Sequence, residues 1–589
     1  MKTDSPLSTC GSPAPRWWQG VLCHRLLPWL SPALACVLYL PTITFGFFGD
    51  DHFLRCALHA RLGSHNVQWF DLYRFTGESA ANNQSLIDDG ILPWWSSPHL
   101  RLHFVRPLTS MLFTADEYLF GSNAVWYRIH SIAWYVALVA TIGFLFRRIL
   151  PNKTANLALV IFTINASHAG LVGWISARHF LIGATLASIG LAAWISLRSR
   201  YGDRAMGISL VGGVIGLLGS EAALGIAFFA AAYSWHAPSV GGVNLDRRWR
   251  TLPWIALVVT YVVAYKLIGG GAQANEGYVD PSSGIGAYVG TLGTRIPALL
   301  ANAIFAMPSE LVLVGASTAC VLAGVVAFVF VLTLLRRTRA RLEEMEVATL
   351  RWVLPGTVFA LVANAGGFPS SRLLLVPNVG FSVLIAVLIM RTAIPLARLA
   401  LVVVHLVLAP IAIVATTCAY HSYGRKIENT ARAAVPQGSG ARPRVFVIGA
   451  SDPFVFMYVH GLLRDTGNLS CWSTLSAARS SHRVTRVSER TLDIEAMDST
   501  WLQGPFESLY RSLREPLHVG DGVRQCGAFI EVVAMQRSIL HRVRVTFDRS
   551  IEDPSVDLLA WRNGKLQRIN LAVGSSEDFS WTVGPSGFF

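Results

Sequence analysis

The sequence predicts a mainly α-helical, polytopic membrane protein that ends in a soluble, β-rich domain. Two features of the whole chain support this fold class. Of the 589 residues, 52% are hydrophobic and only 14% are charged, whereas soluble proteins carry roughly 25% charged residues. Long apolar runs fill the chain up to about residue 420, and shorter runs with more polar residues follow. This composition excludes a soluble enzyme.

The long apolar runs predict the number of membrane spans. A run of about twenty apolar residues can cross the hydrocarbon core as a helix. Eleven such runs are present, at 27–47, 127–146, 155–173, 179–197, 205–219, 221–236, 251–269, 310–335, 350–366, 373–391 and 398–418. The region 205–236 is divided because Gly219, Ser220 and Glu221 interrupt it, and one long helix with a buried acid is the alternative. The first run is expected to remain as an anchor, since it lacks a small-residue cleavage site.

The net charge of +14 indicates topology and argues against nucleic-acid binding. The basic residues lie mostly in short loops between apolar runs, and Lys and Arg near span ends are retained on the cytoplasmic side. Arg147 and Arg148 follow the second run, and Arg336 and Arg337 follow the eighth. We therefore predict a multi-pass membrane protein, with residues 1–26 in the cytoplasm and the C-terminal domain outside.

Two long outer segments separate the predicted spans. The first outer loop, 48–126, contains Trp69, Phe70, Trp94 and Trp95 among polar residues, which is typical of short amphipathic helices in the headgroup layer. The second, 270–309, contains a weakly amphipathic stretch at 284–306 that is also expected to lie along the surface. The transmembrane domain, including these loops, is predicted to occupy 27–420.

The C-terminal region divides into a linker at 421–443 and an extracytoplasmic domain at 444–589. The run 444–449 is a predicted strand that enters a turn, and IGASDPF (448–454) is predicted to lead into a helix. The stretches 538–547 and 558–571 alternate apolar and polar residues, which favours a β-rich module such as a sandwich. Cys471 and Cys526 would both lie outside, where a disulfide is permitted, and the spacing leaves the paired and the free states open.

An acidic pair, Asp50 and Asp51, follows the first apolar run directly. Two adjacent carboxylates beside hydrocarbon are costly without a partner. They are interpreted as a general base or metal ligand at the membrane surface, and the alternative is a polar stop for the span. The predicted topology brings further polar side chains to the same face: Arg106, Tyr127, Arg128, His130, His168, Trp174, Arg178, His179, Glu221 and Arg372. For any single arginine, contact with headgroup phosphates is the alternative.

Such a set of residues can transfer a sugar from a lipid phosphate. A carboxylate accepts the proton of an acceptor hydroxyl, whose oxygen attacks the anomeric carbon, and the departing phosphate requires positive charge. Arginine suits that requirement because its guanidinium binds two phosphate oxygens at once. The apolar body would hold the lipid of the donor.

Several motifs in this order resemble a known superfamily. They are GDDHF (49–53), VRPLTSMLF (105–113), FGSNAVWYRIHSIAW (120–134), HAGLVGWISARHFLIGA (168–184), GSEAA (219–223) and SRLLLVPNVGF (371–381). Together they resemble the C-type (GT-C) polytopic glycosyltransferases, and most closely the protein O-mannosyltransferase branch (glycosyltransferase family 39) and its bacterial relatives. The resemblance covers about two thirds of the chain. It implies an inverting transferase that uses a polyprenyl-phosphate sugar donor and an extracytoplasmic protein, lipid or glycan as acceptor.

The resemblance also implies roles for individual residues. Asp50 matches the catalytic base, and Asp51 would orient a neighbour or bind a metal. The donor phosphate would be bound by Arg178, Arg372 and Arg106, and the substrates by Glu221, His168, His179 and Tyr127; for the histidines, structural hydrogen bonding is the alternative. Ser220 and Ser371 depart from the pattern, because relatives often have a lysine and an acid at these positions.

No cofactor is required by these motifs, and a divalent metal ion is left open. Asp51 and Asp116 are the candidate ligands; the alternative for Asp116 and Glu117 is an acidic pair balanced by Arg106 or Arg128. Two other function classes are also open. A transporter or lipid flippase would show inverted repeats and broken helices, and the sequence shows neither. A non-catalytic scaffold would bind glycan or protein through its outer domain.

Overall fold

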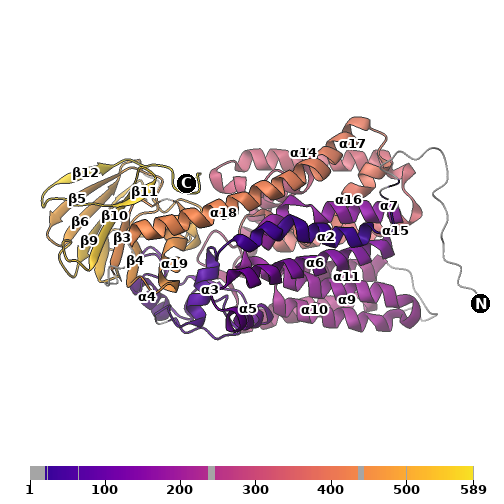
Figure 1. The fold of residues 1–589 in the computed structure, drawn as a ribbon, viewed down its shortest axis with the longest axis horizontal. Coiled ribbons are helices and arrows are strands. Elements are labelled where there is room, and N and C mark those ends of the chain that lie inside the picture. The colour runs from indigo at the N-terminus through magenta and orange to yellow at the C-terminus, as the bar shows by residue number, and fades with distance from the viewer. Residues whose placement is uncertain are drawn as a thin grey trace, which may run out of the picture.

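The computed structural model describes residues 20, 22, 24–63, 65–236, 246–435, 443–450, 452–498 and 501–587. A long helical body forms one half of the molecule, and a β-rich domain lies beyond one end of it (Figure 1). The predicted cytoplasmic segment 1–26 falls mostly outside the described residues, as do Pro436 and Gly438 of the predicted linker.

The predicted apolar runs all coincide with helices. The helical body contains α2 (Leu27–Tyr39) with η1 (Leu40–Thr44), α6 (Ala124–Ile149), α7 (Asn152–Thr163), η2 (Ala166–His168), α8 (Ala169–Gly173), η3 (Ile175–Arg178), α9 (His179–Tyr201), η4 (Gly202–Ala205), α10 (Met206–Gly219), α11 (Ala223–His236), α12 (Arg247–Leu267), α13 (Ile285–Phe305), η6 (Ser309–Val314), α14 (Ser317–Thr338), α15 (Glu344–Asn364), η8 (Ser371–Leu374), α16 (Pro377–Arg391), α17 (Pro395–Val402), the π-helical turn η9 (Val403–Leu408) and α18 (Ala409–Ala434).

The protein is a multi-pass membrane protein by the length and composition of these helices. Among the described residues, six helical segments are long and apolar enough to cross a membrane, or seven if α7 and α8, which are bent by 43° where they meet, form one span. Helices α10 and α11 have 14 residues each and α16 has 15, fewer than the about 20 that a span needs. The number of eleven crossings therefore stays a prediction.

The predicted interruption at 219–221 separates two antiparallel helices. Helix α10 returns along α9, and Gly190 and Gly212 lie at their contact: a Cβ added at Gly212 would lie 2.8 Å from the Cα of Gly190. Small residues permit this close approach of helices. Tyr233 near the end of α11 lies under the guanidinium of Arg198 near the end of α9, at 5.6 Å. The chain therefore turns back between α10 and α11, and the alternative of one long helix is excluded.

Helix α13 corrects the expectation that 284–306 lies along the surface. It packs lengthwise beside α14, where a Cβ at Gly324 would lie 2.2 Å from the carbonyl oxygen of Pro297, and the rings of Phe305 and Phe330 are 5.9 Å apart. The many small residues of α13 allow this contact. One side of the weakly amphipathic stretch therefore faces another helix.

Helix α18 replaces more than half of the predicted linker. It continues to Ala434 and joins the helical body to the β-rich domain (Figure 1). Ile427, Ala431 and Ala434 are buried against that domain. Their spacing places them on one helix face, and this burial extends the helix through residues that the polar composition had assigned to a linker.

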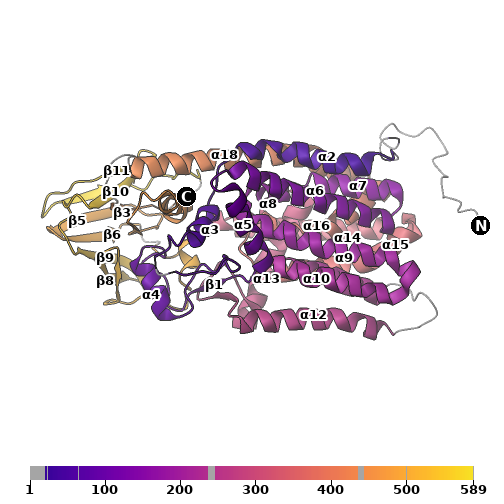
Figure 2. The same cartoon turned by 60° about the horizontal axis from the view of Figure 1, so that its bottom comes forward.

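The first outer loop forms short elements between the body and the domain: α3 (Asp50–Leu58), α4 (Ala80–Asp88), β1 (Arg101–His103) and α5 (Pro107–Phe120). Figure 2 shows this arrangement, and β1 pairs with β2 (Gly271–Gln273) of the second outer segment. The prediction that Trp94 and Trp95 lie in the headgroup layer is wrong. They are 3% and 0% exposed, and their indole nitrogens donate to the carbonyls of Leu475 and Glu507 in the C-terminal domain.

The C-terminal domain has two packed sheets, as the alternating stretches predict. Its strands are β3 (Arg444–Ile448), β4 (Cys471–Thr474), β5 (His482–Ser488), β6 (Thr491–Ala496), β7 (Gly522–Gln525), β8 (Ala528–Gln536), β9 (Ile539–Phe547), β10 (Val556–Arg562), β11 (Lys565–Arg568) and β12 (Ser576–Phe579). They form a four-stranded sheet, β11-β10-β3-β4, and a six-stranded antiparallel sheet, β12-β5-β6-β9-β8-β7, with one core between them. The other face of the smaller sheet packs on α18, η10 (Phe454–Val459) and α19 (His460–Asp465).

A disulfide joins Cys471 and Cys526, which resolves the question that the sequence left open. It links β4 of one sheet to the turn before β8 of the other, and the two cysteines are 55 residues apart in the chain. The first outer loop packs on it, because a Cβ at Gly90 would lie 2.8 Å from each sulfur.

We expect replacement of both cysteines by serine to lower the free energy of unfolding by about 2–5 kcal/mol, because the unfolded chain regains freedom that the crosslink removes. Thermal unfolding in detergent, with and without reductant, measures this. Reductant should lower the midpoint of the wild-type protein and leave that of the double variant unchanged. Equal midpoints for the two proteins without reductant would contradict the prediction.

Candidate functional site

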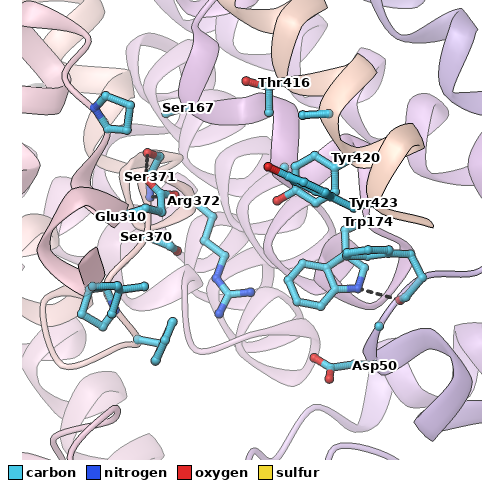
Figure 3. A pocket seen from close by; sticks show the side chains of 18 of the residues that line it. Asp50, Ser167, Trp174, Glu310, Ser370, Ser371, Arg372, Thr416, Tyr420 and Tyr423 are labelled. Atoms are coloured by element: carbon cyan, nitrogen blue, oxygen red, sulfur yellow. Dashed lines mark hydrogen bonds between the residues drawn. The ribbon is translucent and has the colours of Figure 1, made fainter. Parts of the chain in front are cut away.

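A cavity of about 650 Å³ lies where the helical body, the outer loops and the C-terminal domain meet. Figure 3 shows its centre, where Arg372 and Asp50 approach from opposite sides beside Trp174. The first outer loop contributes Asp50, α18 contributes Tyr420 and Tyr423, and the C-terminal domain contributes Tyr458. The cavity thus combines residues that are more than 400 positions apart in the chain.

Asp50 is the acid of the predicted pair that faces the cavity. It begins α3, directly after Gly49, whose φ is +58°. Glycine suits this turn because of the positive φ and because a Cβ would lie 3.3 Å from the rings of Trp174 and Tyr458. Burial raises the pKa of Asp50 to about 6, as does the charge of Asp51, while the charges of Arg372 and Arg106 oppose the rise. The carboxyl therefore changes its protonation close to neutral pH.

Arg372 is the predicted phosphate ligand that reaches the cavity. It lies in η8, just before α16, and its guanidinium stacks on the ring of Trp174 at 5.4 Å. The indole nitrogen of Trp174 donates to the carbonyl of Phe48 at 3.1 Å (Figure 3). One tryptophan therefore contacts both the loop that holds Asp50 and the arginine. The Nε of Arg372 is buried and has no hydrogen-bond partner within the described part of the chain.

Glu310 is a cavity residue that the sequence did not single out. Its two carboxylate oxygens accept hydrogen bonds from the amide and the hydroxyl of Ser371, at 2.7 and 2.6 Å. Asn302 of α13 donates to the same hydroxyl at 2.8 Å. The motif resemblance leads us to expect an acid at position 371. In this chain Ser371 stands there, and the distant Glu310 lies beside it and positions the turn that carries Arg372.

Arg295 of α13 holds the loops on either side of this turn. Its guanidinium donates to the carbonyls of Gly367 at 2.7 Å and Gly277 at 2.9 Å. The cavity residues Phe368 and Tyr278 follow these two glycines in the chain. No motif indicated this role, since it depends on contacts between segments distant in sequence.

Asp51 points away from the cavity, unlike its neighbour. It is fully buried, and its carboxylate accepts from the amides of Phe48 at 3.0 Å and Ser176 at 2.7 Å. The predicted role as a metal ligand or catalytic group has no support in this placement. The observed contacts are structural, and they fix the start of α3.

The other two predicted phosphate ligands are already paired with carboxylates. Arg106 forms a two-point ion pair with Glu221, with Nε 2.9 Å from one oxygen, and Arg178 contacts Asp116 at 2.5 Å. Neither arginine lines the cavity. Asp116 also accepts from His130 at 2.9 Å. These side chains support the outer ends of the helices around the cavity.

The remaining predicted substrate residues also make structural hydrogen bonds outside the cavity. The hydroxyl of Tyr127 donates to Glu117 at 2.6 Å. His179 contacts the hydroxyl of Ser220 at 2.9 Å, and His168 lies 3.0 Å from the hydroxyl of Tyr135. Structural hydrogen bonding, the alternative interpretation of the histidines, therefore agrees with their positions.

The two candidate metal ligands do not form a site together with further ligands. Among the described residues, no group of three or more His, Cys, Asp or Glu side chains is arranged to hold a metal ion. The carboxylate of Asp51 accepts hydrogen bonds from backbone amides, and that of Asp116 contacts Arg178 and His130. The donor set around the cavity thus gives no basis for naming a metal.

A buried ion-pair network fixes the C-terminal domain against the first outer loop. Asp465 at the end of α19 contacts His52 at 2.9 Å and Arg55 at 3.0 Å. Arg55 also contacts Glu117 of α5 at 3.0 Å. Because His52 and Arg55 lie on α3, which begins with Asp50, the C-terminal domain helps to position the candidate base.

The cavity continues from this polar centre into the helical body. It follows one face of η9 and α18, formed by His405, Ala409, Ala412, Thr416, Ala419, Tyr420 and Tyr423. Between His405 at the deep end and the tyrosines at the outer end lie only small residues, so this face within the helical body is formed mainly by small side chains. Such a shape suits an apolar chain below a polar head.

Comparison with known proteins gives distant structural similarity alone. No protein-family model and no curated protein matches the sequence. The oligosaccharyltransferase of Archaeoglobus fulgidus is similar at 12% identity, with a TM-score of 0.40, over 75% of this chain and 63% of its own; this chain thus spans less than two thirds of its length. ArnT from Cupriavidus metallidurans bound to undecaprenyl phosphate is similar at 13% identity, with a TM-score of 0.36, over 88% of this chain and 97% of its own.

Proposed function

We propose that the protein is a membrane glycosyltransferase that moves a sugar from a polyprenyl-phosphate donor to an extracytoplasmic acceptor, with inversion. The observation that carries the proposal is the cavity in which Asp50 and Arg372 approach each other and which continues into the helical body. The motif resemblance to the C-type glycosyltransferases, closest to the protein O-mannosyltransferase branch, supports the same reaction class.

The residues of the cavity divide the chemistry between them. Asp50 accepts the proton of the acceptor hydroxyl, whose oxygen then forms the new bond to the anomeric carbon as the bond to the phosphate breaks. Arg372 binds the phosphate oxygens, on which negative charge increases as the bond breaks. Trp174 keeps the guanidinium in place, because its ring is fixed by the bond to Phe48.

The shape of the cavity orients the donor. The lipid chain lies along the small residues of α18, and the phosphate lies at the level of Arg372. The acceptor then arrives from the side of Asp50, between the first outer loop and the C-terminal domain. Dolichol-phosphate and undecaprenyl phosphate, which two of the structural neighbours hold, belong to this class of lipid.

The proposed orientation places the cavity outside a bacterial inner membrane. Arg147, Arg148 and Arg391 lie at the end of the helical body remote from the cavity, where Thr349 of α15 contacts the carbonyl of Ile149 and Arg391 contacts Glu346 at 2.8 Å. Basic residues at this end favour a cytoplasmic position.

Envelope composition tests the proposed function. Glycans, glycolipids and glycoproteins of cells with and without the protein are compared by mass spectrometry, and we expect one hexose, pentose or aminosugar to be missing from a single class of product. That sugar then identifies the donor for an assay in membranes. Identical envelopes, together with no transfer from any labelled polyprenyl-phosphate sugar, would refute the proposal.

The transfer rate should fall as the pH is lowered through about 6. Asp50 must be ionised to accept a proton, and its pKa is raised to about 6 by burial. The ionised fraction is then about nine tenths at pH 7 and about one tenth at pH 5. Single-turnover rates between pH 5 and 8 measure this dependence, and a rate that rises toward pH 5 would exclude Asp50 as the base.

A further inference from the structure

A second, polar cavity lies beside the first. It measures about 230 Å³ and is separated from the main cavity by Phe48 and Tyr420, which line both. Its wall comes from three places: the end of η1 with the segment after it (44–48), Arg128 and Gly173, and the outer part of α18 with His421, Gly424, Arg425 and Glu428.

The cavity contains a buried guanidinium with unused donors. Arg128 is 1% exposed. One of its terminal nitrogens donates to the carbonyl of Gly173 and the other to that of Gly46 at 2.5 Å. Its Nε has no hydrogen-bond partner among the described residues. A guanidinium has five N–H donors, so several of them remain for a ligand.

The other charged groups around this cavity are mostly basic. Arg425 is exposed at its mouth, and the ring of His421 lies 4.9 Å from that of Phe45. Glu428 is the carboxylate of the lining, and Arg432 lies 3.6 Å from it, which offsets its charge. Two arginines and a histidine thus line the cavity with one partly neutralised acid, and the carboxylate of Asp51, outside the lining, also acts on Arg128. The lining itself favours an anion.

The position of the cavity indicates which anion. Its wall joins the segment that follows α2 and η1 to the outer part of α18, and both α2 and α18 have exposed apolar side chains. Val37 of α2 and Val414 of α18 are exposed, and each lies seven residues, about two helical turns, before a residue of the cavity wall, Thr44 or His421. In a membrane these exposed faces contact lipid chains, so a lipid lying between the two helices would have its headgroup at the level of Arg128 and Arg425.

We propose that Arg128, Arg425 and His421 form a second phosphate site, which binds the headgroup phosphate of a membrane phospholipid. Arg128 binds the phosphate from below, and Arg425 binds it from the mouth. The site is distinct from the main cavity, which we call the donor cavity because it is proposed to hold the sugar donor. Lipid binding there does not depend on the transfer reaction.

Lipid binding to the purified full-length protein tests the site. The probe is phosphatidylglycerol in neutral detergent, and bound lipid is counted by native mass spectrometry. We expect one lipid to remain on the wild-type protein and Arg425→Glu to weaken its binding about tenfold. The matched control is Arg101→Glu, the same charge reversal at an exposed arginine of β1, which should leave binding unchanged. Asp50→Asn and Arg372→Ala, which alter the donor cavity, should also retain the lipid.

Equal binding to the wild-type and Arg425→Glu proteins would overturn the site. Equal retention of diacylglycerol, which has the same chains without phosphate, would show that the phosphate is not recognised. Displacement of the lipid by millimolar inorganic phosphate would assign the site to free phosphate and overturn the phospholipid. Arg128→Lys keeps the positive charge but loses the planar set of guanidinium donors, so it should weaken lipid binding if the variant folds. If it does not fold, the result for Arg425→Glu alone tests the site.

Discussion

Replacement of Asp50 by asparagine should lower the transfer rate by about 10²- to 10⁴-fold, the usual contribution of a general base. Asparagine has nearly the same shape but cannot accept the proton of the acceptor hydroxyl. The measurement is single-turnover transfer in membranes, with the labelled polyprenyl-phosphate sugar that the envelope comparison identifies. Binding of the donor should change little, because the side chain on the phosphate is Arg372.

The neighbouring aspartate provides the matched control. Asp51→Asn should lower the midpoint of thermal unfolding, because Asp51 accepts from the amides of Phe48 and Ser176, and an asparagine has one acceptor oxygen for two buried donors. Asp50→Asn should leave that midpoint unchanged or slightly higher, because it removes a buried charge. Transfer that persists in Asp50→Asn, or a fall in stability of equal size in both variants, would contradict the assignment.

The second large effect is expected at Arg372. Arg372→Ala should lower the transfer rate by about 10²- to 10³-fold and weaken donor binding, since it removes the guanidinium that faces the charge of the departing phosphate. Arg372→Lys should restore part of the rate, because it returns the charge without the two-point geometry. Rates measured over a range of donor concentrations separate the two effects.

Arg101→Ala is the control for Arg372, since Arg101 is an exposed arginine of the same outer face. It should transfer at the wild-type rate. If Arg372→Ala transfers normally while its fold is intact, the phosphate is bound elsewhere. Arg178→Ala and Arg106→Ala are expected to act differently, by lowering stability, because each would leave a carboxylate, Asp116 or Glu221, without its cation.

The positions of the helices in the chain could be predicted from the sequence, because a helix that spans a membrane is a run of consecutive apolar residues. All eleven apolar runs coincide with helices, and the interruption at 219–221 is a reversal of the chain. The strand at 444–449 and the alternating stretches 538–547 and 558–571 were also predicted, the last with one further detail. It forms two strands joined at Asn563 and Gly564, whose φ values of 50° and 76° suit a tight hairpin turn.

Segments that pack against distant parts of the chain were predicted less well. Trp94 and Trp95 lie in a segment whose composition is typical of a surface helix. Their side chains nevertheless pack into the core of the C-terminal domain. Helix α18 extends through a polar stretch because three apolar side chains at helical spacing bury against that domain. In each case the deciding contact comes from residues that no local pattern contains.

The candidate site shows the same division. The sequence by itself determined that an acid at position 50 and an arginine at position 372 lie at one end of the helical body, since span order fixes the end of each helix. Only the tertiary structure decided which charged groups remain available in the cavity. Arg106 and Arg178 are neutralised by Glu221 and Asp116 and Asp51 is held by backbone amides, whereas Asp50 and Arg372 face the open volume. The reason is physical: a buried charge is neutralised by whichever group folding brings against it, and that partner is set by packing between segments and not by neighbours in the chain.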